Sequence, residues 1–204
     1  EYVFINRLKR NKNLGILLLI DASLSSDGYV AGNRIIDVAK EVSILFGEIL
    51  NEYHVDFSIA AFHSHTRNHI EYITIKDFNE SWHQNKNRIG GIQTSSYTKI
   101  GGALMHAATL FDKSQSNNKW LILLSDGKPN DYDTYEGQYG IHDVKQSLYE
   151  LNQSNINSYA FALEAQAKYY LPQMFGQNHY QILSSPDQLI HSLIKLYEKI
   201  RHGQ

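Results

Sequence analysis

The sequence contains no cysteine, which excludes disulfide bonds, thiolate zinc sites and cysteine nucleophiles together. This absence fits a reducing compartment, and we expect a cytoplasmic location. No apolar stretch approaches the roughly 20 residues that a membrane-spanning helix requires, so we expect no membrane insertion. The 19 basic and 21 acidic side chains leave a net charge of −2. This balance lacks the excess of positive charge that is typical of nucleic-acid-binding proteins.

Internal repeats and low-complexity tracts are also absent, and the 204 residues suit one domain with a sizeable core. Residues 1–13 are polar and basic and are expected to form a linker, followed by a single domain over residues 14–204. The chain begins at Glu1 without a signal-like segment. We therefore interpret the sequence as part of a longer protein whose upstream residues contribute to function.

Apolar strands and amphipathic helices alternate along the chain. Strands are expected at 15–21, 56–63, 70–75, 118–126, 158–163 and 180–183, and helices at 31–53, 79–88, 98–111, 141–154, 165–175 and 186–201. The continuous Ile and Leu run before Asp21 is typical of a strand buried on both faces of a parallel sheet. The short link 64–69 permits only antiparallel neighbours. The sequence thus predicts an α/β, Rossmann-like fold with a mostly parallel central sheet, one antiparallel edge strand and helices on both faces.

Polar side chains follow two of these strands. Asp21, Ser23 and Ser25 alternate after the first strand, and Asp126 ends a later apolar strand. Because the carboxyl ends of parallel strands meet at one edge of a sheet, we expect Asp21 and Asp126 to lie close together, with Thr98 presented from a loop. Carboxylate and hydroxyl oxygens suit Mg²⁺, Mn²⁺ or Ca²⁺ better than zinc or copper. Taken alone, Asp21 would more simply be a helix cap.

The order Asp21-x-Ser23-x-Ser25, a distant Thr98 and a distant Asp126 followed by Gly127 resembles the von Willebrand factor A domain and its metal-ion-dependent adhesion site. The resemblance implies that these five residues bind a divalent cation, Mg²⁺ or alternatively Mn²⁺ or Ca²⁺. A carboxylate from a partner protein would complete the coordination. No general base or nucleophile is evident beside this site, so we expect a binding module without catalytic residues.

A wider resemblance covers nearly the whole chain. The segments Asp126–Asp131 and Tyr135–Asp143 look like the carboxyl-terminal A domain of nitric oxide reductase activation proteins of the NorD type, whose relatives include the rubisco-activating CbbO subunits. The resemblance implies an adaptor that works with a MoxR-type AAA+ ATPase to activate or assemble a client enzyme such as nitric oxide reductase. A CbbO-like rubisco activation role is the alternative.

Other interpretations remain open. Asp21 and Asp126 also resemble the strand-end acids of haloacid dehalogenase-type phosphohydrolases, but position 23 is serine where that layout needs a second acid. An adhesion domain outside the cell is a further alternative. His63, His65 and His69 are interpreted as isolated exposed histidines of an edge hairpin in preference to a transition-metal site. The tyrosines at 132, 135 and 139 are either interface anchors or packing groups.

Overall fold

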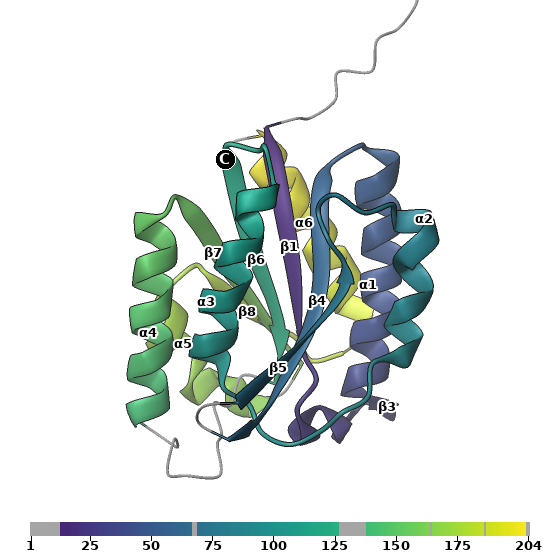
Figure 1. The fold of residues 1–204 in the computed structure, drawn as a ribbon. Helices are drawn as coiled ribbons and strands as arrows, with labels where there is room; N and C mark the ends of the chain where they lie inside the picture. Colours follow the sequence, from purple (N-terminus) through teal and green to yellow (C-terminus); the bar gives the residue numbers. More distant parts are fainter. Residues whose placement is uncertain (1–12, 67–68, 127–137, 164, 186, 203–204) are drawn as a thin grey trace, which may run out of the picture.

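A computed structural model describes residues 13–66, 69–126, 138–163, 165–185 and 187–202, with the side chain of Thr66 left out. Within these ranges the chain forms one six-stranded sheet covered by helices on both faces (Figure 1). Residues 1–12 of the expected linker and most of the tyrosine-containing loop lie outside the described residues.

The central sheet has the strand order β5-β4-β1-β6-β7-β8. The strands are β1 (Leu14–Asp21), β4 (Asp56–Thr66), β5 (His69–Lys76), β6 (Asn118–Ser125), β7 (Ile156–Ala162) and β8 (Tyr180–Ile182). Every neighbouring pair is parallel except β4 and β5, which form the antiparallel edge. The predicted fold class is confirmed.

Strand β1 lies in the middle of the sheet, and all eight of its residues are buried. Successive side chains of a strand point to opposite faces, so β1 contributes to two cores. Ile16, Leu18 and Ile20 pack in one core, and Leu17 and Leu19 pack in the other. This double burial explains why its sequence is a continuous apolar run.

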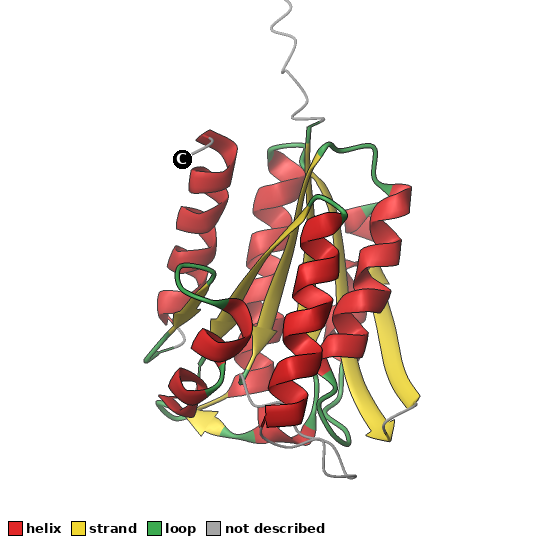
Figure 2. Ribbon diagram, turned by 90° about the vertical axis from the view of Figure 1, so that its left-hand side faces the viewer, coloured by secondary structure: helices red, strands yellow, loops and turns green. Residues whose placement is uncertain are grey.

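The helices form two layers, one on each face of the sheet (Figures 1 and 2). On one face lie α1 (Ile35–Glu52), α2 (Trp82–Asn85) and α6 (Asp187–His202), and on the other lie α3 (Ile100–Leu110), α4 (Gln138–Gln153) and α5 (Leu171–Phe175). None of the helices in the described ranges has the length and apolar character needed to cross a membrane.

Several boundaries differ from the sequence-based expectation. The helix expected from residue 31 begins at Ile35, because a small hairpin of β2 (Tyr29–Val30) and β3 (Asn33–Arg34) precedes it. Ala31 and Gly32 turn this hairpin with φ angles of 51° and 81°. The last helix begins at Asp187, one residue later than expected.

Short 3₁₀ helices replace parts of other expected helices. They are η1 (Leu24–Asp27), η2 (Lys86–Gly91), η3 (Phe111–Lys113) and η4 (Ala165–Tyr169). The helix expected over residues 79–88 is therefore one turn of α2 followed by η2, and the helix expected over 165–175 is divided into η4 and α5.

The glycine pair at the start of α3 allows close packing beside the polar edge of the sheet. A Cβ atom at Gly101 would overlap the carboxylate of Asp143 on α4, and one at Gly102 would overlap Ile70 on β5. The two glycines therefore let the side chains of Asp143 and Ile70 approach the backbone of α3 closely.

Candidate metal site

Two acids meet at the carboxyl ends of neighbouring parallel strands, at the lower edge of the sheet in Figure 1. Asp21 is the last residue of β1, and Asp126 directly follows β6. Their exposed fractions are 2% and 1%. We call the residues Asp21, Ser23, Ser25, Thr98, Ser125 and Asp126 the carboxyl rim.

Hydrogen bonds fix the carboxylate of Asp21 in one orientation. The backbone N–H of Ser23 donates to Oδ1 at 3.0 Å, and the hydroxyl of Ser125 on β6 donates to Oδ2 at 2.7 Å. The Ser26 hydroxyl also donates to the backbone carbonyl of Asp21, at 2.9 Å. The bend after β1 is therefore tied to both the acid and the neighbouring strand.

The two serines of the bend point their hydroxyls at each other. Ser23 Oγ lies 2.9 Å from Ser25 Oγ. Ligands of an octahedral Mg²⁺ ion with bonds of 2.0–2.1 Å are about 2.8–3.0 Å apart, so this spacing suits two neighbouring positions around one ion. Ser23 is buried and Ser25 is exposed, which leaves an open side toward solvent.

The segment before α3 is held against the bend and against β4. Ser95 N–H donates to the carbonyl of Ala22, and Leu24 N–H donates to the carbonyl of Ser96. Tyr97 exchanges two backbone hydrogen bonds with Ser64 of β4. This docking brings Thr98, which is 1% exposed, to the same rim as Asp21 from a position 77 residues away along the chain.

The electrostatics of the rim favour a cation. Burial, and then the negative charge of Asp126, raise the pKa of Asp21 from its ordinary value to about 7, although hydrogen bonds from Ser23 and Ser125 oppose this rise. Two adjacent buried carboxylates repel each other when both are ionised. A divalent cation between them would remove this repulsion, and the carboxylate and hydroxyl donors are those that Mg²⁺, Mn²⁺ or Ca²⁺ prefers.

A second polar cluster supports the bend from outside. Asp27 at the end of η1 accepts hydrogen bonds from Thr94 Oγ1 at 2.5 Å and from Arg34 Nε at 3.0 Å, and it is also paired with the Arg34 Nη2 group. These contacts lower the pKa of Asp27, with the Thr94 hydrogen bond as the largest cause. The sequence did not single out these three residues, because Thr94 is 67 positions from Asp27.

The simpler cap interpretation of Asp21 is wrong. The residue that precedes η1 is Ser23, which makes no side-chain capping hydrogen bond, and α1 begins only at Ile35. Asp21 instead accepts the N–H of Ser23 and the hydroxyl of Ser125. Its carboxylate thus joins the bend to β6 and caps no helix.

The sequence and fold agree with one family model. Residues 15–195 match the von Willebrand factor type A domain. The chain belongs to the von Willebrand factor type A domain family. Its described strand order and two helical layers are therefore those of a von Willebrand factor type A domain.

Similar proteins fall into two groups. The chain is 32% identical over 188 residues to Protein NorD of Stutzerimonas stutzeri. The aligned region covers 91% of this chain and 31% of that protein. It is 32% identical over 189 residues to Protein NorD of Brucella melitensis, with 92% of this chain and 30% of that protein covered. The chain thus spans about a third of the length of these curated relatives.

A solved structure, the PilB minor pilin from Streptococcus sanguinis, resembles the chain with a TM-score of 0.71. The likeness covers 92% of this chain and 61% of the pilin, at 13% sequence identity. At this identity the comparison shows a shared fold alone.

Proposed function

We propose that this chain is a metal-dependent protein-binding module. In this proposal Asp21, Ser23, Ser25, Thr98 and Asp126 hold one Mg²⁺ ion, with Mn²⁺ or Ca²⁺ as alternatives. The observation that carries the proposal is the pair of buried neighbouring carboxylates, Asp21 and Asp126, at the open end of the sheet. Exposed Ser25 leaves the ion accessible from one side, where an Asp or Glu carboxylate of a partner would bind as a further ligand.

The similarity to NorD proteins supports an adaptor role within a longer protein. There the module would connect a MoxR-type AAA+ ATPase with a client enzyme such as nitric oxide reductase. A CbbO-like role, with rubisco as the client, is the alternative. No nucleic-acid partner and no catalytic residue form part of this proposal.

A phosphohydrolase is the less supported alternative. Position 23, where a general acid would be needed, is a serine whose backbone N–H is bonded to Asp21. Hydrolysis of p-nitrophenyl phosphate in Mg²⁺, lost in Asp21→Asn, would favour that alternative over a binding module.

Metal binding is tested by thermal unfolding in EDTA and in millimolar Mg²⁺, Mn²⁺ or Ca²⁺. An ion at about 100 times its Kd stabilises the folded chain by about 2.7 kcal/mol, so the melting temperature should rise. Asp21→Ala should abolish this rise. Asp112→Ala removes an exposed acid of η3 and should retain it. No shift with any of the three ions would contradict the proposal.

Partner binding is tested by a pull-down from lysate in Mg²⁺ and in EDTA, with Asp21→Ala as the control bait. Recovery of an AAA+ ATPase together with nitric oxide reductase or rubisco only in Mg²⁺ would support the adaptor role and identify the client. Recovery of the same proteins in EDTA and with Asp21→Ala would place the docking surface away from the metal.

A further inference from the structure

The β4–β5 hairpin carries a second group of ligating side chains, which we call the hairpin triad: His63, His65 and Glu71. One ligand atom from each of the three lies within 4.8 Å of the others. Glu71 of β5 is paired with His63 of β4, and a register shift between Ser64 and Thr66 accompanies His65. The rings of His63 and His65 are 5.1 Å apart. His63 is buried and so differs from the expected exposed histidine, whereas His65 and His69 are exposed as expected.

Both imidazole rings face the same carboxylate oxygen. His63 Nε2 lies 3.5 Å and His65 Nε2 lies 3.4 Å from Oε2 of Glu71. Charge-assisted hydrogen bonds between nitrogen and carboxylate are shorter, at about 2.7–2.9 Å. Ligands of a tetrahedral ion with bonds of 2.0–2.2 Å are instead separated by roughly 3.3–3.6 Å. The two nitrogen–oxygen distances thus match those between ligands of one ion, and the ligand atoms of the two histidines lie within 4.8 Å of each other.

A hydrogen bond on the far side orients the exposed ring. His65 Nδ1 lies 2.6 Å from the hydroxyl of Ser96. When Nδ1–H donates to this hydroxyl, the lone pair of Nε2 points toward Glu71. Metal-binding histidines usually have such a partner on the other ring nitrogen, which fixes the tautomer and the ring orientation.

The other ring, that of His63, is buried. His63 is 5% exposed, and its Nδ1 has no hydrogen-bond partner among the described residues. The role of His63 as a ligand rests on the position of its Nε2, which lies 3.5 Å from Oε2 of Glu71.

We propose that the hairpin triad binds a transition-metal ion of the Zn²⁺ class through His63, His65 and Glu71. Two imidazole nitrogens and one carboxylate oxygen suit such an ion, whereas Mg²⁺ prefers oxygen ligands alone. Three protein ligands leave one tetrahedral position for water or for a side chain of a partner. This site shares no residue with the carboxyl rim and does not depend on the function proposed for the rim.

Calorimetric titration of the chain with Zn²⁺ tests the proposal, with excess Mg²⁺ present to occupy the rim. We expect one Zn²⁺ ion per chain. His65→Ala and Glu71→Gln each remove one exposed ligand and should weaken binding at least tenfold, since loss of outer partners alone costs about 10–100-fold. Ser96→Ala should weaken binding by about tenfold. His142→Ala, an exposed histidine of α4, is the matched control and should bind as the original chain does.

Substitution with Co²⁺ provides an independent measurement, because the visible absorption of Co²⁺ reports its coordination geometry. A tetrahedral spectrum that is lost in both His65→Ala and Glu71→Gln would support the site. Absence of Zn²⁺ binding would overturn the proposal. Binding that survives both substitutions, or that is lost only in Asp21→Ala, would overturn it equally, because the ion would then lie elsewhere.

Discussion

The two ends of the central sheet both bury charged side chains, but they compensate these charges differently. At the carboxyl rim, Asp21 lies beside a second acid, Asp126, and burial raises the pKa of Asp21 to about 7. At the opposite end, where β4 begins and β5 ends, Lys76 is only 4% exposed. Burial lowers the pKa of Lys76 to about 8, and the negative charges of Asp56, Asp77 and Glu80 oppose that shift.

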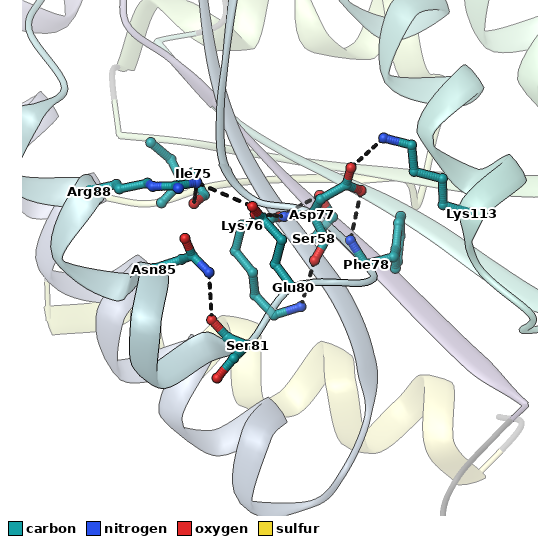
Figure 3. Close-up of polar contacts among 10 residues, drawn as sticks. All are labelled: Ser58, Ile75, Lys76, Asp77, Phe78, Glu80, Ser81, Asn85, Arg88 and Lys113. Carbon is teal, nitrogen blue, oxygen red and sulfur yellow. Dashed lines mark hydrogen bonds and ion pairs between the residues drawn. The ribbon is translucent and has the colours of Figure 1, made fainter.

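The protein itself supplies the partners of Lys76. Its Nζ donates to the carbonyl of Phe57 at 2.5 Å and to the carbonyl of Asp77 at 2.9 Å, and lies 4.2 Å from the centroid of the Phe57 ring. Figure 3 shows the surrounding contacts, in which the Asp77 carboxylate is paired with Lys113 and accepts the N–H of Phe78 at 2.7 Å. Carbonyl oxygens and an aromatic ring therefore contact this lysine directly, and the nearby carboxylate of Asp77 is paired with Lys113.

This contrast distinguishes a binding site from a structural polar cluster. A buried charge with carbonyl oxygens and opposite charges around it is partly compensated within the fold. Two neighbouring buried acids oppose each other, so an added cation would stabilise the folded chain. The Lys76 cluster is therefore interpreted as structural, and the carboxyl rim as the place where a ligand binds.

Removal of one rim acid should change the stability of the chain most, by increasing it. In EDTA and at a pH above 7, Asp21→Asn should stabilise the chain by about 2–4 kcal/mol, because the folded state no longer holds an ionised Asp21 whose pKa is about 7 against an ordinary 3.8. Urea denaturation measures the change. Asp112→Asn is the control, and its free energy of unfolding should change little. A loss of stability in Asp21→Asn would contradict the view that Asp21 and Asp126 repel each other in the metal-free chain.

The second prediction concerns the opposite end. The pKa of Lys76 is about 8 in the folded chain against an ordinary 10.5, so the unfolded chain binds the extra proton between these values. The free energy of unfolding should therefore rise by about 3 kcal/mol from pH 8 to 10.5 through this group alone. Lys76→Met should lack this rise, whereas exposed Lys195→Met should keep it. Parallel pH profiles of the original chain and Lys76→Met would refute the assignment.

The sequence alone predicted the fold class and the segments that meet at the rim. This was possible because β1 is buried on both faces and its last residue is an acid. Both the apolar run and its end can therefore be recognised in the sequence. The β2–β3 hairpin was not predicted, because Ala31 adopts a positive φ angle that is uncommon outside glycine.

The hydrogen bonds that support the rim could not be predicted from the sequence, for a different physical reason. Ser125 is 104 positions from Asp21, and Thr94 is 67 positions from Asp27, so these pairs depend on strand order and loop docking. The role of Glu71 likewise depends on the register of β4 and β5, which the spacing of histidines does not reveal. The five metal ligands of the rim remain a prediction.

Asp21 accepts one hydroxyl hydrogen bond at its carboxylate, from Ser125, and another at its backbone carbonyl, from Ser26, and the two should differ in their contribution to stability. Ser125→Ala removes the hydrogen bond to Asp21 Oδ2 and should destabilise the metal-free chain by about 1–2 kcal/mol at a pH above 7. Ser26→Ala removes a bond to the backbone carbonyl of Asp21 and should cost about 1 kcal/mol or less. Urea denaturation in EDTA compares the two variants. Equal losses of stability in the two variants would mean that the hydrogen bond to the carboxylate contributes no more than the hydrogen bond to the carbonyl.

The smallest effect is expected where charges are paired but accessible to water. Lys86 donates to Glu48 at 2.7 Å, and this hydrogen bond is the largest cause of the lowered pKa of Glu48. Both side chains are more than a third exposed to solvent. Solvent screening should therefore limit the loss in Glu48→Gln to about 0.5 kcal/mol, and most of this loss should vanish in about 1 M salt. If Glu48→Gln lost as much stability as Ser125→Ala, charge pairing and not burial would determine the free energies of these polar contacts.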